Sequence, residues 1–201
     1  MNGDQMINIF TYQNLLEEIN KKTTKKEQII GFVYAPYYQT KIAKIVDQFY
    51  DWWQINNSEI LRFFWLGYYE GEKINCDYCF QVDSHKSSYV YFNLQLFETL
   101  IQEVNKHWNY TYNEHFEIVF VRKYENKIDF KRKIRIDFDK YFNSVDDTRD
   151  IFAQIRNVVE EYKTFSALEK EIKNRKCLKR LRVVSFETLI SLIPNFTKSH
   201  I

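Results

Sequence analysis

The chain contains few residues of the kinds that interrupt or cross-link a fold: four glycines, two prolines and three cysteines among 201 residues. The scarcity of glycine and proline argues against long flexible linkers. Three cysteines are an odd and small number, which does not suggest a disulfide framework. No stretch approaches the ~18 uncharged apolar residues of a spanning helix. The start, Met1 to Asp4, lacks a basic cluster and an apolar run, so no secretory signal is expected. These absences predict a reduced, cytoplasmic protein that does not enter a membrane.

Apolar and aromatic residues, in contrast, are abundant. Hydrophobic residues make up 45% of the chain and aromatic residues 18%, which suffices for a packed core in one domain with an extra segment. The net charge of +2 conceals an asymmetry. Residues 163–201 contain nine basic and three acidic residues, a net of +6, which leaves −4 for residues 1–162. The sequence therefore combines a weakly acidic body with a basic C-terminal segment.

Apolar periodicity and turn residues predict an alternation of strands and helices. A short helix over 11–20 comes first. The expected order is then strand 29–34, helix 40–53, strand 60–66, strand 73–82, helix 92–108, strand 116–121, strand 128–138, helix 147–162 and helix 166–179. The crossover helix between the strands at 29–34 and 60–66 predicts that these strands are adjacent and parallel. A strand at 181–186 and a short helix at 187–193 complete the expected order.

This order resembles the thioredoxin fold between Ile29 and Tyr162, with an insertion from Gly71 to Tyr91. The resemblance implies an α/β fold with a mixed sheet, helices on both faces and a helical C-terminal extension. We expect residues 1–165 to form the thioredoxin-like domain and residues 166–201 a basic extension packed on it. Trp52 to Ile55, together with Ile60 to Tyr68, also faintly resembles a pattern in small uncharacterised bacterial proteins, which brings no known activity.

The chain departs from thioredoxins where their chemistry resides. Thioredoxins place Cys-x-x-Cys at the start of the first long helix, where the helix dipole lowers the pKa of a thiol. Ala35, Pro36, Tyr37 and Tyr38 occupy that position here. The run Asn109 to Glu114 also lacks the proline that precedes the third strand in thioredoxins. Disulfide exchange at this position is therefore not expected.

Aromatic residues from two loops are the first candidate site. In the assumed topology, the end of the strand at 29–34 lies beside the loop that precedes the strand at 116–121. An aromatic-lined cleft for a ligand or partner is one interpretation, and packing of loop and core is the other. The cleft residues would be Tyr37, Tyr38, Trp108, Tyr110 and Tyr112.

Cys76 and Cys79 form a Cys-x-x-Cys motif, with His85 as a possible third zinc ligand. The alternation of Ile74, Cys76, Tyr78 and Phe80 instead predicts a strand. Cysteines three apart on a strand point to opposite faces, so we expect neither a disulfide nor a zinc site. Redox chemistry and zinc binding remain as alternatives.

Two charged groups of residues complete the candidates. Asp137, Asp139, Asp146, Asp147 and Asp150 could hold a divalent ion, although such residues are more often found at strand ends and helix caps. In the basic segment, one helical face could bind nucleic-acid phosphates, or it could simply be solvated. The residues of that face are Lys173, Lys176, Lys179 and Arg180.

These observations favour a non-redox, thioredoxin-like protein-interaction module rather than an enzyme, with a protein partner and no cofactor. One alternative is a nucleic-acid-directed toxin or phage-defence factor that uses the basic C-terminal helix. Another is a metal-dependent hydrolase. A fold does not decide among these functions, because function resides in local sites.

Overall fold

The computed structural model describes most of the chain in separate ranges. These are residues 11–21, 27–55, 60–83, 89–107, 111–125, 127–138, 155–161 and 163–173.

The main sheet contains four strands in the order β2-β1-β6-β7. Strand β1 (Gln28–Tyr34) lies at its centre, parallel to β2 (Leu61–Trp65) and antiparallel to β6 (Glu117–Tyr124). Strand β7 (Lys127–Asp137) is the antiparallel partner of β6. The prediction that the first two strands are adjacent and parallel is confirmed, with Phe32 beside Phe64 in the register.

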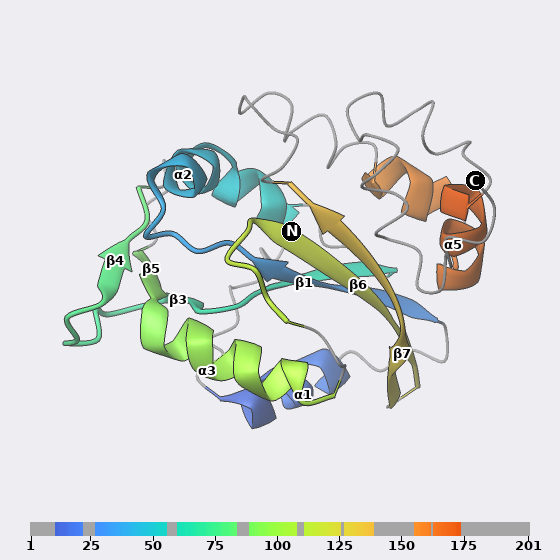
Figure 1. Cartoon of the computed structure of the whole chain (residues 1–201), viewed down its shortest axis with the longest axis horizontal. Helices are drawn as coiled ribbons and strands as arrows, with labels where there is room; N and C mark the ends of the chain where they lie inside the picture. The colour runs from blue at the N-terminus through green and yellow to red at the C-terminus, as the bar shows by residue number, and fades with distance from the viewer. Residues whose placement is uncertain are drawn as a thin grey trace.

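Helices cover both faces of this sheet, as Figure 1 shows. Helix α2 (Thr40–Ile55) lies on one face, and α1 (Tyr12–Lys21) and α3 (Leu94–Asn105) lie on the other. Every residue of β1 and β2 is buried. A central strand covered on both sides is apolar on both sides, which explains its unbroken run of hydrophobic residues. The protein therefore belongs to the mixed α/β class.

A second, smaller sheet stands beside the end of the first. Its order is β3-β5-β4, from β3 (Tyr68–Glu70), β5 (Val90–Asn93) and β4 (Cys79–Gln81). Gly67 makes the turn from β2 into β3 with φ +83°, a conformation that favours glycine. A Cβ at this position would lie only 2.6 Å from the Cβ of Phe97. Glycine at this position therefore allows α3 to pack closely against the junction of the two sheets.

The second sheet corrects two sequence predictions. The helix expected from Phe92 begins at Leu94, because Val90–Asn93 is a strand whose Phe92 packs among aromatic rings of both neighbouring strands. The side chain of Asn93 then accepts a hydrogen bond from Leu96 N at 2.9 Å and caps the helix. The strand expected over 73–82 is limited to Cys79–Gln81, and a turn at 77–78 precedes it.

The C-terminal part of the described chain packs on β7. Residues 155–161 are helical, and α5 (Phe165–Lys173) follows. Arg132 of β7 forms an ion pair with Glu169, and its guanidinium lies 5.6 Å from the centroid of the Phe165 ring. Phe165 and Leu168 belong to the main core.

Several sequence predictions lie outside the described residues. They concern the helix before residue 155, the helix beyond Lys173, and the strand and short helix expected over 181–193. The domain division at residue 165 therefore stays a prediction.

Candidate functional site

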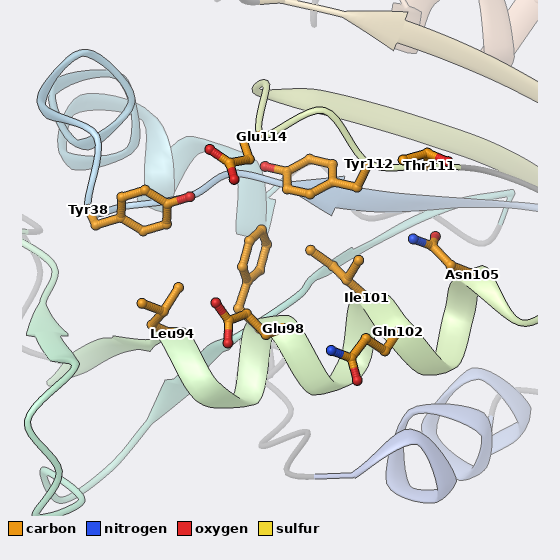
Figure 2. A pocket seen from close by; sticks show the side chains of 10 residues that line it. Tyr38, Leu94, Glu98, Ile101, Gln102, Asn105, Thr111, Tyr112 and Glu114 are labelled. Carbon is orange, nitrogen blue, oxygen red and sulfur yellow. The ribbon is translucent and has the colours of Figure 1, made fainter.

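A groove of about 480 Å³ runs between α3, the loop before β6 and the start of α2. Its volume falls within the ~300–1,000 Å³ range of ligand-binding clefts. Figure 2 shows the side chains that converge on it from these three segments. The lining residues are Tyr38, Leu94, Phe97, Glu98, Ile101, Gln102, Asn105, Thr111, Tyr112 and Glu114.

Helix α3 supplies the floor of the groove through residues at helical spacing. Leu94, Phe97 and Ile101 recur at intervals of three and four residues, so they share one face of the helix. Phe97 and Ile101 are buried, and Leu94 is half-buried. Glu98 and Gln102 lie beside this stripe and are exposed. The floor is therefore apolar with a polar edge.

Tyr112 forms the opposite wall and is held in place by aromatic contacts. Its ring stacks on Tyr34 of β1 at 5.3 Å between centroids and meets Phe97 edge-on at 5.7 Å. Its hydroxyl donates to the backbone carbonyl of His115 at 3.0 Å. These contacts order the loop and leave Tyr112 as a rigid, half-buried wall.

A line of charged side chains fixes the far end of this loop. Nδ1 of His115 lies 2.8 Å from Oδ2 of Asp137, and Asp137 lies 3.9 Å from the guanidinium of Arg135. Arg135 in turn pairs with the fully buried carboxylate of Glu117. Because a buried carboxylate is stable only with a partner, the pair anchors the start of β6.

Glu114 stands at the rim of the groove in an uncommon backbone conformation. Its φ is 60°, in the left-handed region that non-glycine residues rarely occupy. The side chain of Gln39 donates to its carbonyl oxygen at 2.7 Å and joins the loop to the start of α2. Backbone strain of this kind is common at functional sites, where the surrounding structure maintains it. Here it presents an exposed carboxylate to the groove.

The electrostatic character of the groove is acidic. Burial raises the pKa of Tyr38, a hydrogen bond with Gln39 lowers it, and the carboxylates of Glu114 and Glu98 raise it. Both carboxylates therefore act on the same hydroxyl. Among the described residues, neither Glu98 nor Glu114 has an ion-pair partner. The groove thus combines aromatic faces with two unneutralised negative charges.

The structure brings together only part of the predicted aromatic cleft. Tyr38 and Tyr112 line the groove, and in Figure 2 their hydroxyl ends point toward Glu114. Tyr37 faces the second sheet instead. Its hydroxyl donates to Asp47 at 2.7 Å, and its ring packs on Tyr68 and Phe92, which excludes it from the groove. Trp108 and Tyr110 lie outside the described residues.

Sequence reasoning missed the contribution of α3 and both glutamates. A signal for the floor was present, because Leu94, Phe97 and Ile101 recur at helical spacing within the helix predicted over 92–108. The two glutamates come from segments separated in the chain and carried no pattern of their own. Only the packing of the loop on α3 places them together.

The alternating strand predicted through Cys76 and Cys79 is wrong. A turn at 77–78 replaces it, and the two side chains lie in contact instead of on opposite faces. Cys76 packs against the cluster formed by Tyr69, Cys79 and Tyr91. Both cysteines are free thiols in the structure.

The described residues provide no metal site and only one residue of the predicted nucleic-acid surface. In these ranges, no group of three or more His, Cys, Asp or Glu residues could hold a metal ion. Asp137 is engaged by His115 and Arg135, and the other four candidate aspartates lie outside the described ranges, as does His85. Lys173 is the last residue of α5, and the remaining three basic residues lie beyond the described part.

Comparison with known proteins gives no assignment: no family model, no curated protein and no solved structure matches the chain. A search of the described residues for a helix long and apolar enough to cross a bilayer finds none.

Proposed function

We propose that the protein is a thioredoxin-like protein-interaction module whose groove beside α3 binds a basic segment of a partner protein. The observation that carries the proposal is the pairing of Glu98 and Glu114 across an aromatic-lined groove, with no cation among the described residues to neutralise them. The class of partner follows from this charge.

The parallel β1–β2 unit followed by the antiparallel β6–β7 hairpin supports a thioredoxin-like fold. In place of cysteines, the loop after β1 contributes Tyr38 to the groove. Tyrosine is favoured at interfaces because it combines a large apolar ring with a hydroxyl that can bond to a partner. Binding without disulfide exchange at this position is therefore the role that the residues support.

A basic side chain fits the groove on three grounds. An arginine or lysine head can pair with Glu98 and Glu114, and its charge can lie over the face of Tyr38 or Tyr112. The alkyl stem of the same residue can pack on Leu94 or Ile101. An acidic segment would instead meet two like charges, which is unfavourable.

Selection from a random-peptide display library, followed by synthetic peptides, tests this function. Wild-type protein is expected to enrich peptides with arginine or lysine beside an aliphatic residue. Replacing that basic residue with norleucine should weaken binding about tenfold, equivalent to about 1.4 kcal/mol. Affinity should also fall as salt is raised, because the contacts are exposed charge pairs.

The double variant Glu98→Gln/Glu114→Gln removes both charges with little change of shape and should lose the basic preference. Glu72→Gln/Glu125→Gln is the matched control, because it changes the net charge equally at exposed positions outside the groove. Selection of acidic peptides, or loss of binding in the control as large as in the groove variant, would overturn the proposal.

A further inference from the structure

The two free thiols of Cys76 and Cys79 lie together at the N-terminal end of α3. In the antiparallel register, Cys79 is the partner of Asn93, the residue that caps the helix. The backbone N–H of Leu94 donates to the carbonyl oxygen of Tyr78, within the turn that separates the cysteines, at 3.1 Å. The Cys-x-x-Cys turn is thus attached directly to the start of a helix of 12 residues.

Polar groups surround both sulfur atoms. Nδ2 of Asn93 donates to Sγ of Cys76 at 3.5 Å, and the hydroxyl of Tyr69 shares a hydrogen bond with Sγ of Cys79 at 2.9 Å. The same hydroxyl accepts the N–H of Ile74 at 3.0 Å, which fixes the start of the turn. These hydrogen bonds fix the positions of both sulfur atoms beside the start of α3.

The two thiols differ in access. Cys76 is partly exposed, whereas Cys79 is buried. Burial raises the pKa of the Cys79 thiol, and its hydrogen bond with Cys76 raises it as well. A small reagent from solution therefore meets Cys76 first, and Cys79 lies behind it as a second thiol.

We propose that Cys76 and Cys79 form a reversible intramolecular disulfide by exchange with a small-molecule disulfide. The thiolate of Cys76 attacks one sulfur of the reagent, a mixed disulfide forms, the S–S bond of the reagent breaks and one thiolate leaves. Cys79 loses its proton and attacks Sγ of Cys76, which releases the second thiolate. Two protein thiols are thereby oxidised to one disulfide, and one disulfide reagent is reduced to two thiols.

This modification site is independent of the proposed groove function, because neither cysteine lines the groove. It also reverses the expectation from sequence that the two cysteines do not combine. The physical reason is the turn at 77–78, which brings together residues that a regular strand would separate.

The test equilibrates the full chain in mixtures of reduced and oxidised glutathione, alkylates the remaining thiols and maps the peptides by mass. Cys76 and Cys79 are expected to lose alkylation together, with a cross-linked peptide that reductant reverses, while Cys177 stays alkylated. In the Cys79→Ser variant, oxidation should stop at a glutathione adduct on Cys76. In Cys76→Ser, the buried Cys79 should form at least tenfold less adduct.

Full alkylation of both residues in the most oxidising mixture would overturn the proposal. A lasting glutathione adduct on Cys76 in the wild-type protein, or a bond from either residue to Cys177, would overturn it as well. Because the primary measurement uses the unaltered chain, a folding defect in a serine variant does not affect the conclusion.

Discussion

Two charged regions on the same face of the main sheet differ in burial and in ion pairing. Under α1, Glu18 and Arg62 are each 6% exposed and form an ion pair at 3.5 Å. Beside α3, Glu98 and Glu114 are exposed at the edge of a groove, and neither has an ion-pair partner among the described residues. One region is closed and neutralised, and the other is open and negative.

The difference separates charges that support the fold from charges that are available to a ligand. Arg62 also donates to the backbone carbonyls of Glu18 and Ile19, at 3.2 and 3.4 Å, and its guanidinium lies 5.0 Å from the centroid of Phe64. These contacts of Arg62 attach α1 to the sheet, so the charge of this residue serves the fold. Among the residues that the structure describes, no ion pair engages the carboxylates of Glu98 and Glu114, which supports the proposal that the groove is the binding site.

The largest effect is expected in the closed region. Arg62→Ala should lower the free energy of unfolding by about 1–3 kcal/mol, because the backbone carbonyls of Glu18 and Ile19 lose their buried donor. The carboxylate of Glu18 keeps Lys21, at 2.6 Å, as its remaining partner. Chemical denaturation measures the loss. The double variant Glu18→Leu/Arg62→Met should recover most of it, since apolar residues of similar size often replace a buried pair at little cost. A loss below about 1 kcal/mol for Arg62→Ala would show that α1 is not held by this pair.

Charge reversal sharpens the contrast in the open region. Glu98→Lys should weaken binding of a basic peptide at least about tenfold, while the free energy of unfolding changes by no more than about 0.5 kcal/mol. A peptide with glutamate in place of its basic residue should regain affinity for this variant. Calorimetric titration measures both peptides. Equal losses for the two peptides would mean that shape, not charge, determines recognition.

A smaller effect is expected from the backbone at the groove rim. Glu114→Gly should raise the free energy of unfolding by about 0.5–1 kcal/mol, because glycine adopts a positive φ without strain. Binding of a basic peptide should weaken at the same time, since the carboxylate is lost. Glu125, with φ 53° in the turn between β6 and β7, is the matched control. Glu125→Gly should stabilise similarly and leave binding unchanged.

The smallest effect concerns pH in the closed region. Burial lowers the pKa of Lys123, and the charge of Arg62 lowers it further. Between the folded and unfolded pKa values the unfolded chain binds more protons, so this residue makes stability rise with pH. The free energy of unfolding of the wild type relative to Lys123→Met should therefore rise from neutral to alkaline pH. The exposed Lys131→Met variant should show no such trend, and a falling trend for Lys123→Met would contradict this assignment.

The sequence predicted the main sheet well because its strands are marked by burial on both faces. Ile29 to Tyr34 is apolar without interruption, and the helix after it allows only a parallel return. The second sheet was missed in part because its strands contain only three or four residues. Phe92 fitted the apolar spacing of the following helix, and only the capping role of Asn93 separates the two elements.

The sequence predicted only the part of the candidate site that follows from the order of strands. That order places the C-terminal end of β1 beside the loop before β6, and so Tyr38 near Tyr112. The sequence placed Tyr37 in the same cleft, but its position depends on Asp47 and on the second sheet, which the sequence did not reveal. Glu98 and Glu114 acquire meaning only from tertiary packing. The same holds for Cys76 and Cys79, whose contact depends on a turn that alternation concealed.

An amide chemical-shift map of the protein, titrated with a basic peptide selected from the library, locates the binding surface directly. Perturbed amides should gather around the groove, at Tyr38, Glu98, Ile101, Tyr112 and Glu114. The variant Glu98→Gln/Glu114→Gln should abolish these shifts at the same peptide concentration. Shifts confined to α1 or α5, or a groove pattern that persists unchanged in the double variant, would contradict the proposed function.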